Sequence, residues 1–313
     1  MPASKQPRRI AIVGTGVIGA SWAAYYLAQG FDVTATDPAP NAESKLREYV
    51  DSAWPSLIKI GLHLDASRER LAFEPVMARA LTDADLVQEN APERPDFKAT
   101  LFAELDEAAP PDAILASSSS SLPIDVIASK CKRPERCVIG HPFNPPHLIP
   151  LVEVVGGART SEETIERAMK FYAEIGKRPI RLYKALPGHV ANRFQAALYK
   201  EVLYLVQEGV LSVQDADIAV AYGPGLRWGV MGPSLQWHLG GGEGGIRHFM
   251  DHLMAPLEGL FKALGTPNVT PELKETIVEA VLHEASNVPV SELAAKENSV
   301  LIALQSIRRE AGL

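Results

Sequence analysis

The first forty residues alternate hydrophobic runs with glycine-containing turns. Arg9–Val13 is a short apolar run rich in β-branched residues and predicts a strand, while residues 20–29 predict a helix that ends at Gly30. Residues 31–36 predict a second strand. The order strand, turn, helix, strand is typical of the first unit of a parallel α/β sheet.

The same alternation continues to about residue 186. Residues 41–80 look helical, with a helix end or a kink expected at Trp54-Pro55, and residues 98–109 predict another helix. Four further apolar runs predict strands, at residues 84–89, 113–116, 137–140 and 148–155.

Beyond residue 186 the strand-like runs give way to helical patterns. Residues 191–208 and 212–222 predict amphipathic helices, and residues 255–313 are rich in helical patterns broken by proline and glycine. We therefore predict an α/β fold, with a Rossmann-type doubly wound, mostly parallel sheet in residues 1–186. An all-α domain for substrate binding and dimerisation is expected in residues 187–313.

Composition narrows the class of protein. The chain has 313 residues, of which 46% are hydrophobic and 22% charged, and a net charge of -7, which argues against a nucleic-acid partner. No apolar run approaches the ~20 residues that span a membrane. Cys131 and Cys137 provide neither a disulfide framework nor companions for a metal. We expect a cytoplasmic protein that binds a small molecule and no metal.

The turn after the first predicted strand has the spacing of a dinucleotide-binding fingerprint. Gly14 permits a tight turn, Gly16 lets a pyrophosphate approach the backbone, and Gly19 lets helix and strand pack closely. Asp37 follows the second strand, where a carboxylate binds the adenosine ribose and repels a 2′-phosphate. The pattern predicts NAD as the cofactor, bound by Gly14, Gly16, Val17, Ile18, Gly19 and Asp37.

A second group of polar residues combines a hydroxyl, an imidazole and a carboxylate. Ser120 lies in a run of five serines after a predicted strand, His141 follows another strand, and Glu153 lies inside an apolar run. A buried carboxylate needs a partner, and His141 is available. These are the groups required to take a proton from an alcohol. Glu93 follows a third strand and is either a solvated loop acid or a cofactor contact.

Four motifs together resemble those of the 3-hydroxyacyl-CoA dehydrogenase family, over nearly the whole chain. They are Ser119-Ser-Ser-Leu122, His141-Pro-Phe-Asn-Pro145, Leu151-Val-Glu-Val154 and Pro187-Gly-His-Val-Ala-Asn-Arg193. The resemblance implies that His141 is the general base, that Glu153 is its partner, and that Ser120 and Asn192 bond the reacting oxygen. It also implies cofactor-side positions at Glu93, Lys98, Ser118 and Asn144.

Within that family the chain is more similar to the branch that contains L-carnitine dehydrogenase, with L-gulonate 3-dehydrogenase and λ-crystallin as relatives. The segments 223–233 and 241–249, with Trp54-Pro55 and the His-Pro-Phe-Asn-Pro form, are features of this similarity, and the Gly-x-Gly-Phe-Tyr ending of the acyl-CoA enzymes is missing. His147 and His189 depart from the branch, the latter because phenylalanine is usual after Pro-Gly. The resemblance implies NAD-dependent oxidation of L-carnitine to 3-dehydrocarnitine. The alternatives are an L-3-hydroxyacyl-CoA, L-gulonate, or a non-catalytic NAD-binding role.

A substrate such as L-carnitine carries a trimethylammonium group and a carboxylate. Aromatic faces attract the cation, although Trp237 and Phe249 could equally be core residues, and Arg193 or Arg227 could bind the carboxylate. A homodimer through the C-terminal helices is also implied by the resemblance. The expected substrate-binding residues are Phe143, His147, Gly188, Val190, Ala191, Arg193, Arg227, Trp228, Trp237 and Phe249.

Overall fold

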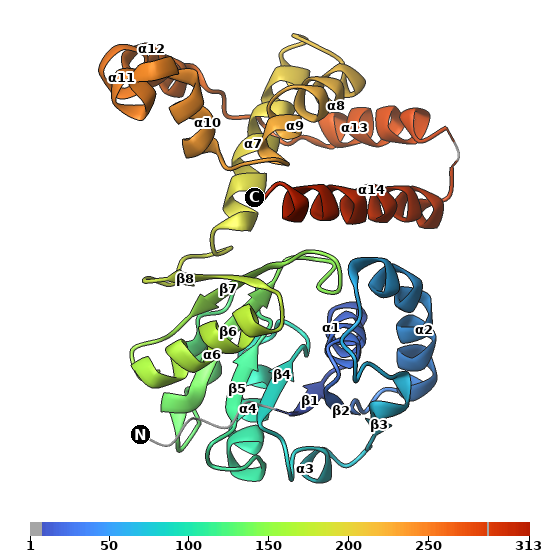
Figure 1. The fold of residues 1–313 in the computed structure, drawn as a ribbon. Helices are drawn as coiled ribbons and strands as arrows, with labels where there is room; N and C mark the ends of the chain where they lie inside the picture. The colour runs from blue at the N-terminus through green and yellow to red at the C-terminus, as the bar shows by residue number, and fades with distance from the viewer. Residues whose placement is uncertain (1–7, 287) are drawn as a thin grey trace. The chain divides into compact units, whose positions relative to one another are not determined.

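The structure is a computed structural model that describes residues 8–286 and 288–313. The chain forms two compact units, Met1–Asn192 and Arg193–Leu313 (Figure 1). The first unit contains a sheet with flanking helices, and the described part of the second is helical. The fold class predicted from the sequence is confirmed.

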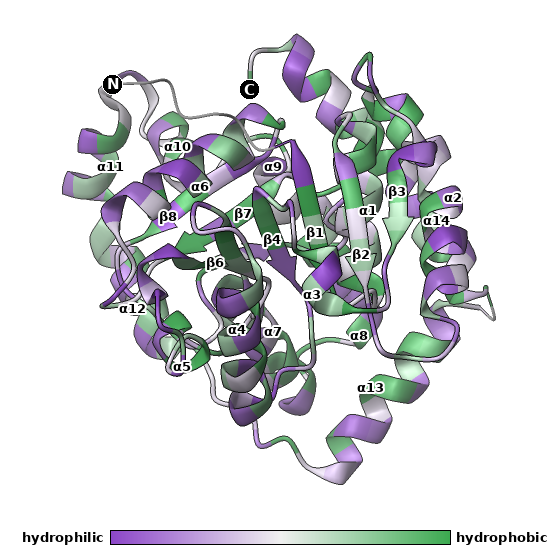
Figure 2. Ribbon diagram, turned by 90° about the horizontal axis from the view of Figure 1, so that it is seen from below, coloured by the Kyte–Doolittle hydropathy of each residue, from purple (hydrophilic) through white to green (hydrophobic). Residues whose placement is uncertain are grey.

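In the described part of the first unit, eight strands form one sheet in the order β3-β2-β1-β4-β5-β6-β7-β8. Neighbouring strands are parallel except for the antiparallel pair β6 and β7. The strands carry mostly hydrophobic residues (Figure 2). Their bounds are β1 Arg9–Val13, β2 Asp32–Thr36, β3 Leu71–Phe73, β4 Leu86–Glu89, β5 Ile114–Ser117, β6 Cys137–Pro142, β7 Leu151–Val155 and β8 Arg178–Leu182.

Helices cover both faces of this sheet. In β1, Ile10 and Ile12 point to one hydrophobic core while Ala11 and Val13 point to the other, as the two-residue period of a strand requires. The first core is completed by α1 (Val17–Ala28), α2 (Ala42–Ile60) and α6 (Glu162–Glu174). The second is completed by α3 (Met77–Ala80), α4 (Pro95–Ala108) and α5 (Ile124–Ile127).

The segment 41–80 differs from the continuous helical reading of the sequence. Helix α2 ends at Ile60, and a 3₁₀ turn at Arg68–Arg70, strand β3 and helix α3 follow it. Pro55 lies inside α2 and does not end it. Ala53 and Leu57 on either side of this proline are buried in the core against α1, so packing of the apolar face holds the helix together across it.

The second unit is built from helices joined by short turns. No helix among the described residues of the whole chain is long and apolar enough to cross a membrane. The helix bounds are α7 Ala191–Gln207, α8 Val213–Tyr222, α9 Pro224–Trp228, α10 Pro233–Gly240, α11 Gly245–His252, α12 Met254–Ala263, α13 Pro271–Glu284 and α14 Val290–Glu310. Helix α7 begins at Ala191, within the first unit, which ends at Asn192.

Candidate active site

The turn between β1 and α1 has the geometry that a dinucleotide pyrophosphate requires. Gly14 has a φ of 85° and donates from its backbone N–H to the Thr36 carbonyl at 2.9 Å. A Cβ on Gly19 would lie 1.9 Å from the Gly14 carbonyl oxygen, so only glycine permits this close packing. Gly16, the N-cap of α1, has open space where a Cβ would stand. The exposed turn therefore fits a phosphate at the helix N-terminus.

Asp37 lies beside this turn at the carboxyl end of β2. Its Oδ2 accepts from the Thr15 backbone N–H at 2.7 Å and from the Thr15 hydroxyl at 3.1 Å, while Oδ1 accepts from the Ala39 N–H at 2.8 Å. These bonds fix the carboxylate next to the glycines and leave it partly exposed. Its place matches that of the acid that binds a ribose in dinucleotide folds.

His141 and Glu153 lie opposite one another in the antiparallel pair β6 and β7. The His141 Nδ1 and the Glu153 Oε2 are 2.8 Å apart, and both residues are buried. A carboxylate only accepts hydrogen bonds, so Nδ1 carries the proton and the basic Nε2 of neutral His141 is left for a substrate. The sequence analysis placed His141 after the strand, but the structure places it within β6.

Glu153 is also bound at its second oxygen. The backbone N–H groups of Val190 and Ala191, at the start of α7, donate to Oε1 at 2.8 and 3.0 Å. Burial raises the pKa of Glu153, but the hydrogen bonds from His141, Ala191 and Val190 outweigh it and hold the pKa below its usual value. The carboxylate is therefore kept ionised opposite His141. The backbone N–H groups of Val190 and Ala191 thus bind Glu153, while the expected contact of these residues with a substrate stays a prediction.

Glu93 organises the serine segment that follows β5. Its Oε1 accepts from the Ser119 hydroxyl at 2.5 Å, from the Ser120 N–H at 3.0 Å, and from both the N–H and the hydroxyl of Ser121 at 3.0 Å. Burial raises the pKa of Glu93, but these bonds and the charge of Lys98 lower it overall. The acid therefore shapes the backbone around Ser120 from inside the loop.

Lys98 is buried beneath this segment. Its Nζ lies 2.7 Å from the Glu89 Oε1 and 3.4 Å from the Glu93 Oε2. The Ser117 hydroxyl donates to the other Glu89 oxygen at 2.5 Å. Glu89 thus links the end of β4 to Ser117 of β5 and to Lys98 of α4. Glu89 is a central member of this group that the sequence analysis did not single out.

The remaining expected residues of the first unit lie in different settings. Ser118 donates to the Asn90 Oδ1 at 2.8 Å and accepts from the Gln88 amide at 2.9 Å. Ser120 and Asn192 are partly exposed, as are Phe143 and Gly188, whereas Asn144 is exposed.

His147 is turned into the protein core. It is 6% exposed, its Nδ1 lies 2.8 Å from the Ser21 hydroxyl of α1, and its backbone N–H donates to the same oxygen at 2.9 Å. Burial, helped by the charge of Lys177, lowers its pKa to about 4. The ring holds the loop after β6 against α1, and the contact with substrate expected from its position beside the motif stays a prediction.

The other expected substrate residues belong to the second unit. Trp237 of α10 stacks on Phe249 of α11 with ring centroids 4.7 Å apart; Phe249 is buried and Trp237 is 41% exposed. The Arg227 Nε donates to the Gln236 Oε1 at 2.8 Å. Trp228 and Arg193 are exposed. Among residues 8–286 and 288–313, no cluster of His, Cys, Asp or Glu could hold a metal ion.

Two family models match consecutive parts of the chain. The 3-hydroxyacyl-CoA dehydrogenase NAD-binding domain matches residues 9–185, and the C-terminal domain of the same enzymes matches residues 188–286. The chain belongs to the 3-hydroxyacyl-CoA dehydrogenase family. It is an NAD-dependent dehydrogenase, which agrees with the fit of the glycine turn and Asp37 to a dinucleotide.

Relatives in this family share most of the chain. L-carnitine dehydrogenase of Streptomyces coelicolor is 44% identical over 298 residues, which cover 95% of this chain and 94% of that protein. The L-carnitine dehydrogenase of Bacillus cereus is 43% identical over 297 residues, with 95% and 91% covered. The crystal structure of 5-formyl-3-hydroxy-2-methylpyridine 4-carboxylic acid 5-dehydrogenase, an NAD⁺-dependent dismutase, has a TM-score of 0.83 at 30% identity, covering 96% and 98%.

Proposed function

We propose that this dehydrogenase oxidises the 3-hydroxyl of L-carnitine to give 3-dehydrocarnitine. The observation that carries the reaction type is the buried His141–Glu153 pair, with 2.8 Å between Nδ1 and Oε2. The choice of substrate is supported by the names of the relatives that are 43–44% identical over nearly the whole chain.

His141 acts as the general base. Its Nε2 takes the hydroxyl proton of the substrate, and Glu153 stabilises the imidazolium that this transfer creates. NAD, when bound, accepts the hydride from the same carbon, which becomes the carbonyl carbon. In the reverse direction the His141 imidazolium returns the proton to the oxygen.

Ser120 and Asn192 donate hydrogen bonds to the oxygen as its charge changes. Support for Ser120 comes from Glu93, which fixes its backbone N–H at 3.0 Å and so restricts where the hydroxyl can lie. Asn192 is the second residue of α7, directly after the Val190 and Ala191 amides that bind Glu153. Asn192 thus adjoins the amides that hold Glu153, whereas Ser120 is held by Glu93.

The two ends of the substrate need opposite partners. Trp228 and Trp237 are 44% and 41% exposed and so have faces available to a trimethylammonium group. The buried ring of Phe249 stacks on Trp237. Arg193 and Arg227 are the arginines that we assign to the carboxylate. Gln236 fixes the Arg227 guanidinium at Nε, and its other nitrogens remain able to donate to a carboxylate.

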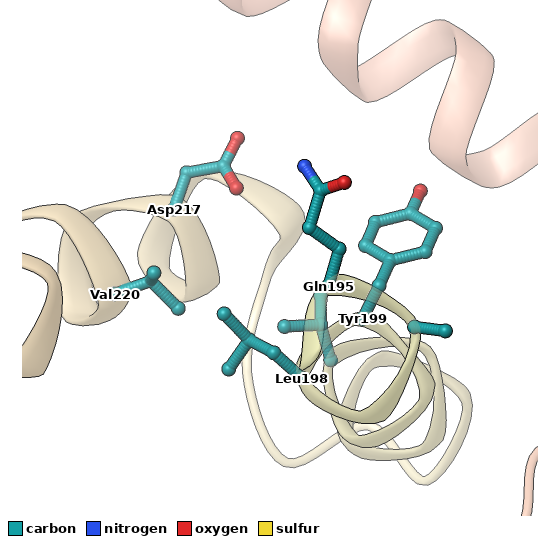
Figure 3. Close-up of a pocket in the computed structure, with 7 residues that line it drawn as sticks. Gln195, Leu198, Tyr199, Asp217 and Val220 are labelled. Atoms are coloured by element: carbon teal, nitrogen blue, oxygen red, sulfur yellow. The ribbon is translucent and has the colours of Figure 1, made fainter. Parts of the chain in front are cut away.

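We also propose a cytoplasmic homodimer formed through the C-terminal helices. In the second unit, a pocket is lined mainly by apolar side chains of α7 and α8, among them Leu198, Tyr199 and Val220 (Figure 3). Leu282 of α13 and Val300 of α14 are each 66% exposed. Light scattering should give about twice the chain mass of 33.9 kDa. A monomer at working concentration would refute the dimer.

A substrate panel tests the function. NADH formation is measured with L-carnitine, D-carnitine, L-gulonate, short 3-hydroxy acids and 3-hydroxybutyryl-CoA. The matched control is 3-hydroxy-5,5-dimethylhexanoate, in which carbon replaces the nitrogen of carnitine without changing its shape. We expect kcat/KM for L-carnitine to exceed that of this neutral analogue by roughly 2- to 30-fold per aromatic contact. Activity on the thioester alone would overturn the proposal, and activity on none would favour a non-catalytic role.

A further inference from the structure

His189 lies beside the catalytic pair, although the reaction described above gives it no part. It occupies the turn before α7 with a φ of 48°, and its backbone N–H donates to the Leu186 carbonyl at 3.0 Å. The residue is 2% exposed. A non-glycine residue held in the left-handed region and buried at a site of chemistry calls for an explanation in terms of function.

The position of one proton on His189 follows from its hydrogen bond. Its Nε2 lies 2.9 Å from the Ser119 carbonyl oxygen, which can only accept, so Nε2 carries the hydrogen. The other nitrogen, Nδ1, is buried and has no hydrogen-bond partner among the described residues. A proton on Nδ1 would therefore be buried without an acceptor, and the neutral imidazole is favoured.

The ring of His189 also contacts the ring of the general base. The centroids of His189 and His141 are 5.0 Å apart, with planes tilted by 45°. Burial lowers the pKa of His189; the Ser119 carbonyl opposes this, and the charge of His141 lowers the pKa further. The carboxylates of Glu153 and Glu93 raise it, but the balance is a lowered pKa. Near neutral pH the neighbour of His141 is thus an uncharged ring.

We propose that His189 is a positioning residue for the oxidation. Its Nε2–H ties the backbone of the serine segment to the turn that carries the Glu153-binding amides. Because the His189 ring is neutral, the proton transferred to His141 gives the two imidazoles only one positive charge. The inference rests on the proposed role of His141 as base. His189 neither gains nor loses a proton in the reaction cycle; when acid protonates it, a second cation lies against His141 and the reaction stops.

The pH dependence of kcat/KM distinguishes this role from a purely structural one. If both imidazoles must be neutral, log kcat/KM against pH should steepen on the acid side from a slope of one towards a slope of two. His189→Gln retains an amide N–H that can reach the Ser119 carbonyl but cannot titrate. Its acid limb should keep a slope of one. A wild-type slope of one throughout, or a slope of two in His189→Gln, would overturn the proposal.

A second variant tests the tie to Ser119. His189→Phe keeps a flat ring but removes both nitrogens. Because a neutral hydrogen bond contributes about 0.5–1.5 kcal/mol, kcat should fall roughly 2- to 12-fold below that of His189→Gln. Equal kcat values for the two variants would contradict the tie. After each acid measurement the enzyme is returned to neutral pH and its activity is measured again. Activity lost by titration then recovers, whereas activity lost by unfolding does not.

The placement of the proton can be measured without a substrate. Nitrogen-15 NMR of histidine-labelled enzyme, with His189→Gln used for assignment, should show a neutral Nε2–H tautomer at pH 7. If that is seen while no compound in the panel is oxidised, the proposed function fails and the assigned state of His189 stands. A protonated ring, or an Nδ1–H tautomer, at pH 7 would refute the inference whatever the substrate.

Discussion

His141 and Glu153 are direct partners across the antiparallel pair β6 and β7, and their side chains meet at 2.8 Å on one face of the sheet. This geometry depends on the change of direction between β6 and β7, after which β8 runs parallel to β7. Residues 143–150 form too short a link for a parallel crossover, which needs a dozen residues or more. The short link therefore forces the pairing that brings the acid opposite the imidazole.

Removing the charge of Glu153 should prevent His141 from acting as a base, although the histidine itself is unchanged. In Glu153→Gln, the Val190 and Ala191 amides favour the side-chain oxygen, which leaves the NH₂ group facing His141 Nδ1. Nδ1 must then accept, so the hydrogen moves to Nε2, which can no longer take a proton. We expect kcat to fall at least ~100-fold while the KM for NAD stays unchanged. Glu162→Gln, which alters an exposed ion pair with Arg181, is the control; undiminished turnover in Glu153→Gln would exclude this tautomer argument.

His141→Ala should separate cofactor binding from turnover. The glycine turn and Asp37 follow β1 and β2, away from His141 on β6, so NAD affinity measured by calorimetry should remain near that of the wild type. Turnover should drop at least ~100-fold, the low end for a lost general base. His283→Ala, at an exposed position in α13, serves as the matched control. A His141→Ala enzyme with near-full turnover would disprove the assignment.

Two glycines of the same turn should respond differently to one added methyl group. In Gly19→Ala the new Cβ would lie 1.9 Å from the Gly14 carbonyl, so the backbone must move and the free energy of unfolding should fall by about 1–3 kcal/mol. In Gly16→Ala the Cβ meets nothing within 4 Å, so stability without cofactor should change by less than about 1 kcal/mol. NAD binding should weaken, because the methyl group fills the space for the pyrophosphate. Urea unfolding without NAD, followed by NAD titration, measures both; equal destabilisation by the two changes would contradict the geometry.

The buried His147 should make the first unit sensitive to mild acid. Its pKa in the folded state is lowered to about 4 from 6.5, so the unfolded chain binds the proton first as pH falls. Stability is complete above pH 6.5 and is lost progressively down to about pH 4, amounting to roughly 2 kcal/mol at about pH 5. His147→Asn can keep a bond to Ser21 and cannot titrate, so its unfolding free energy should vary less over this window. The exposed His63→Asn is the control, and identical pH curves for wild type and His147→Asn would refute the prediction.

Local patterns predicted the elements that carry the site. The glycine spacing identified the β1 turn, α1 and Asp37, and the embedded acid in an apolar run identified Glu153 as a buried partner of His141. These signals are local because each combines strand periodicity with a polar residue that the periodicity does not explain. Strand β3 was not predicted, because its three residues are too few to show a hydrophobic period.

The residues placed differently depend on contacts between distant parts of the chain. His147 lies next to the catalytic motif in sequence, but its ring bonds Ser21, which is 126 residues away. Lys98 likewise reaches Glu89, whose buried place at the end of β4 gives no local signal of an ion pair. The Ser119 carbonyl that fixes His189 is 70 residues distant. No pattern within a single element specifies these pairs.

The amides of Val190 and Ala191 that bind Glu153 have a consequence for recombining this enzyme with its relatives. A chimaera that exchanged the helical unit at residue 186 would replace the turn whose amides bind Glu153, together with His189. A crossover after Asn192 would keep His141, Glu153 and the two amides from one parent and take the residues that we propose for substrate binding in the second unit from the other. The better crossover point therefore lies within the first turn of α7 and not in the loop before it.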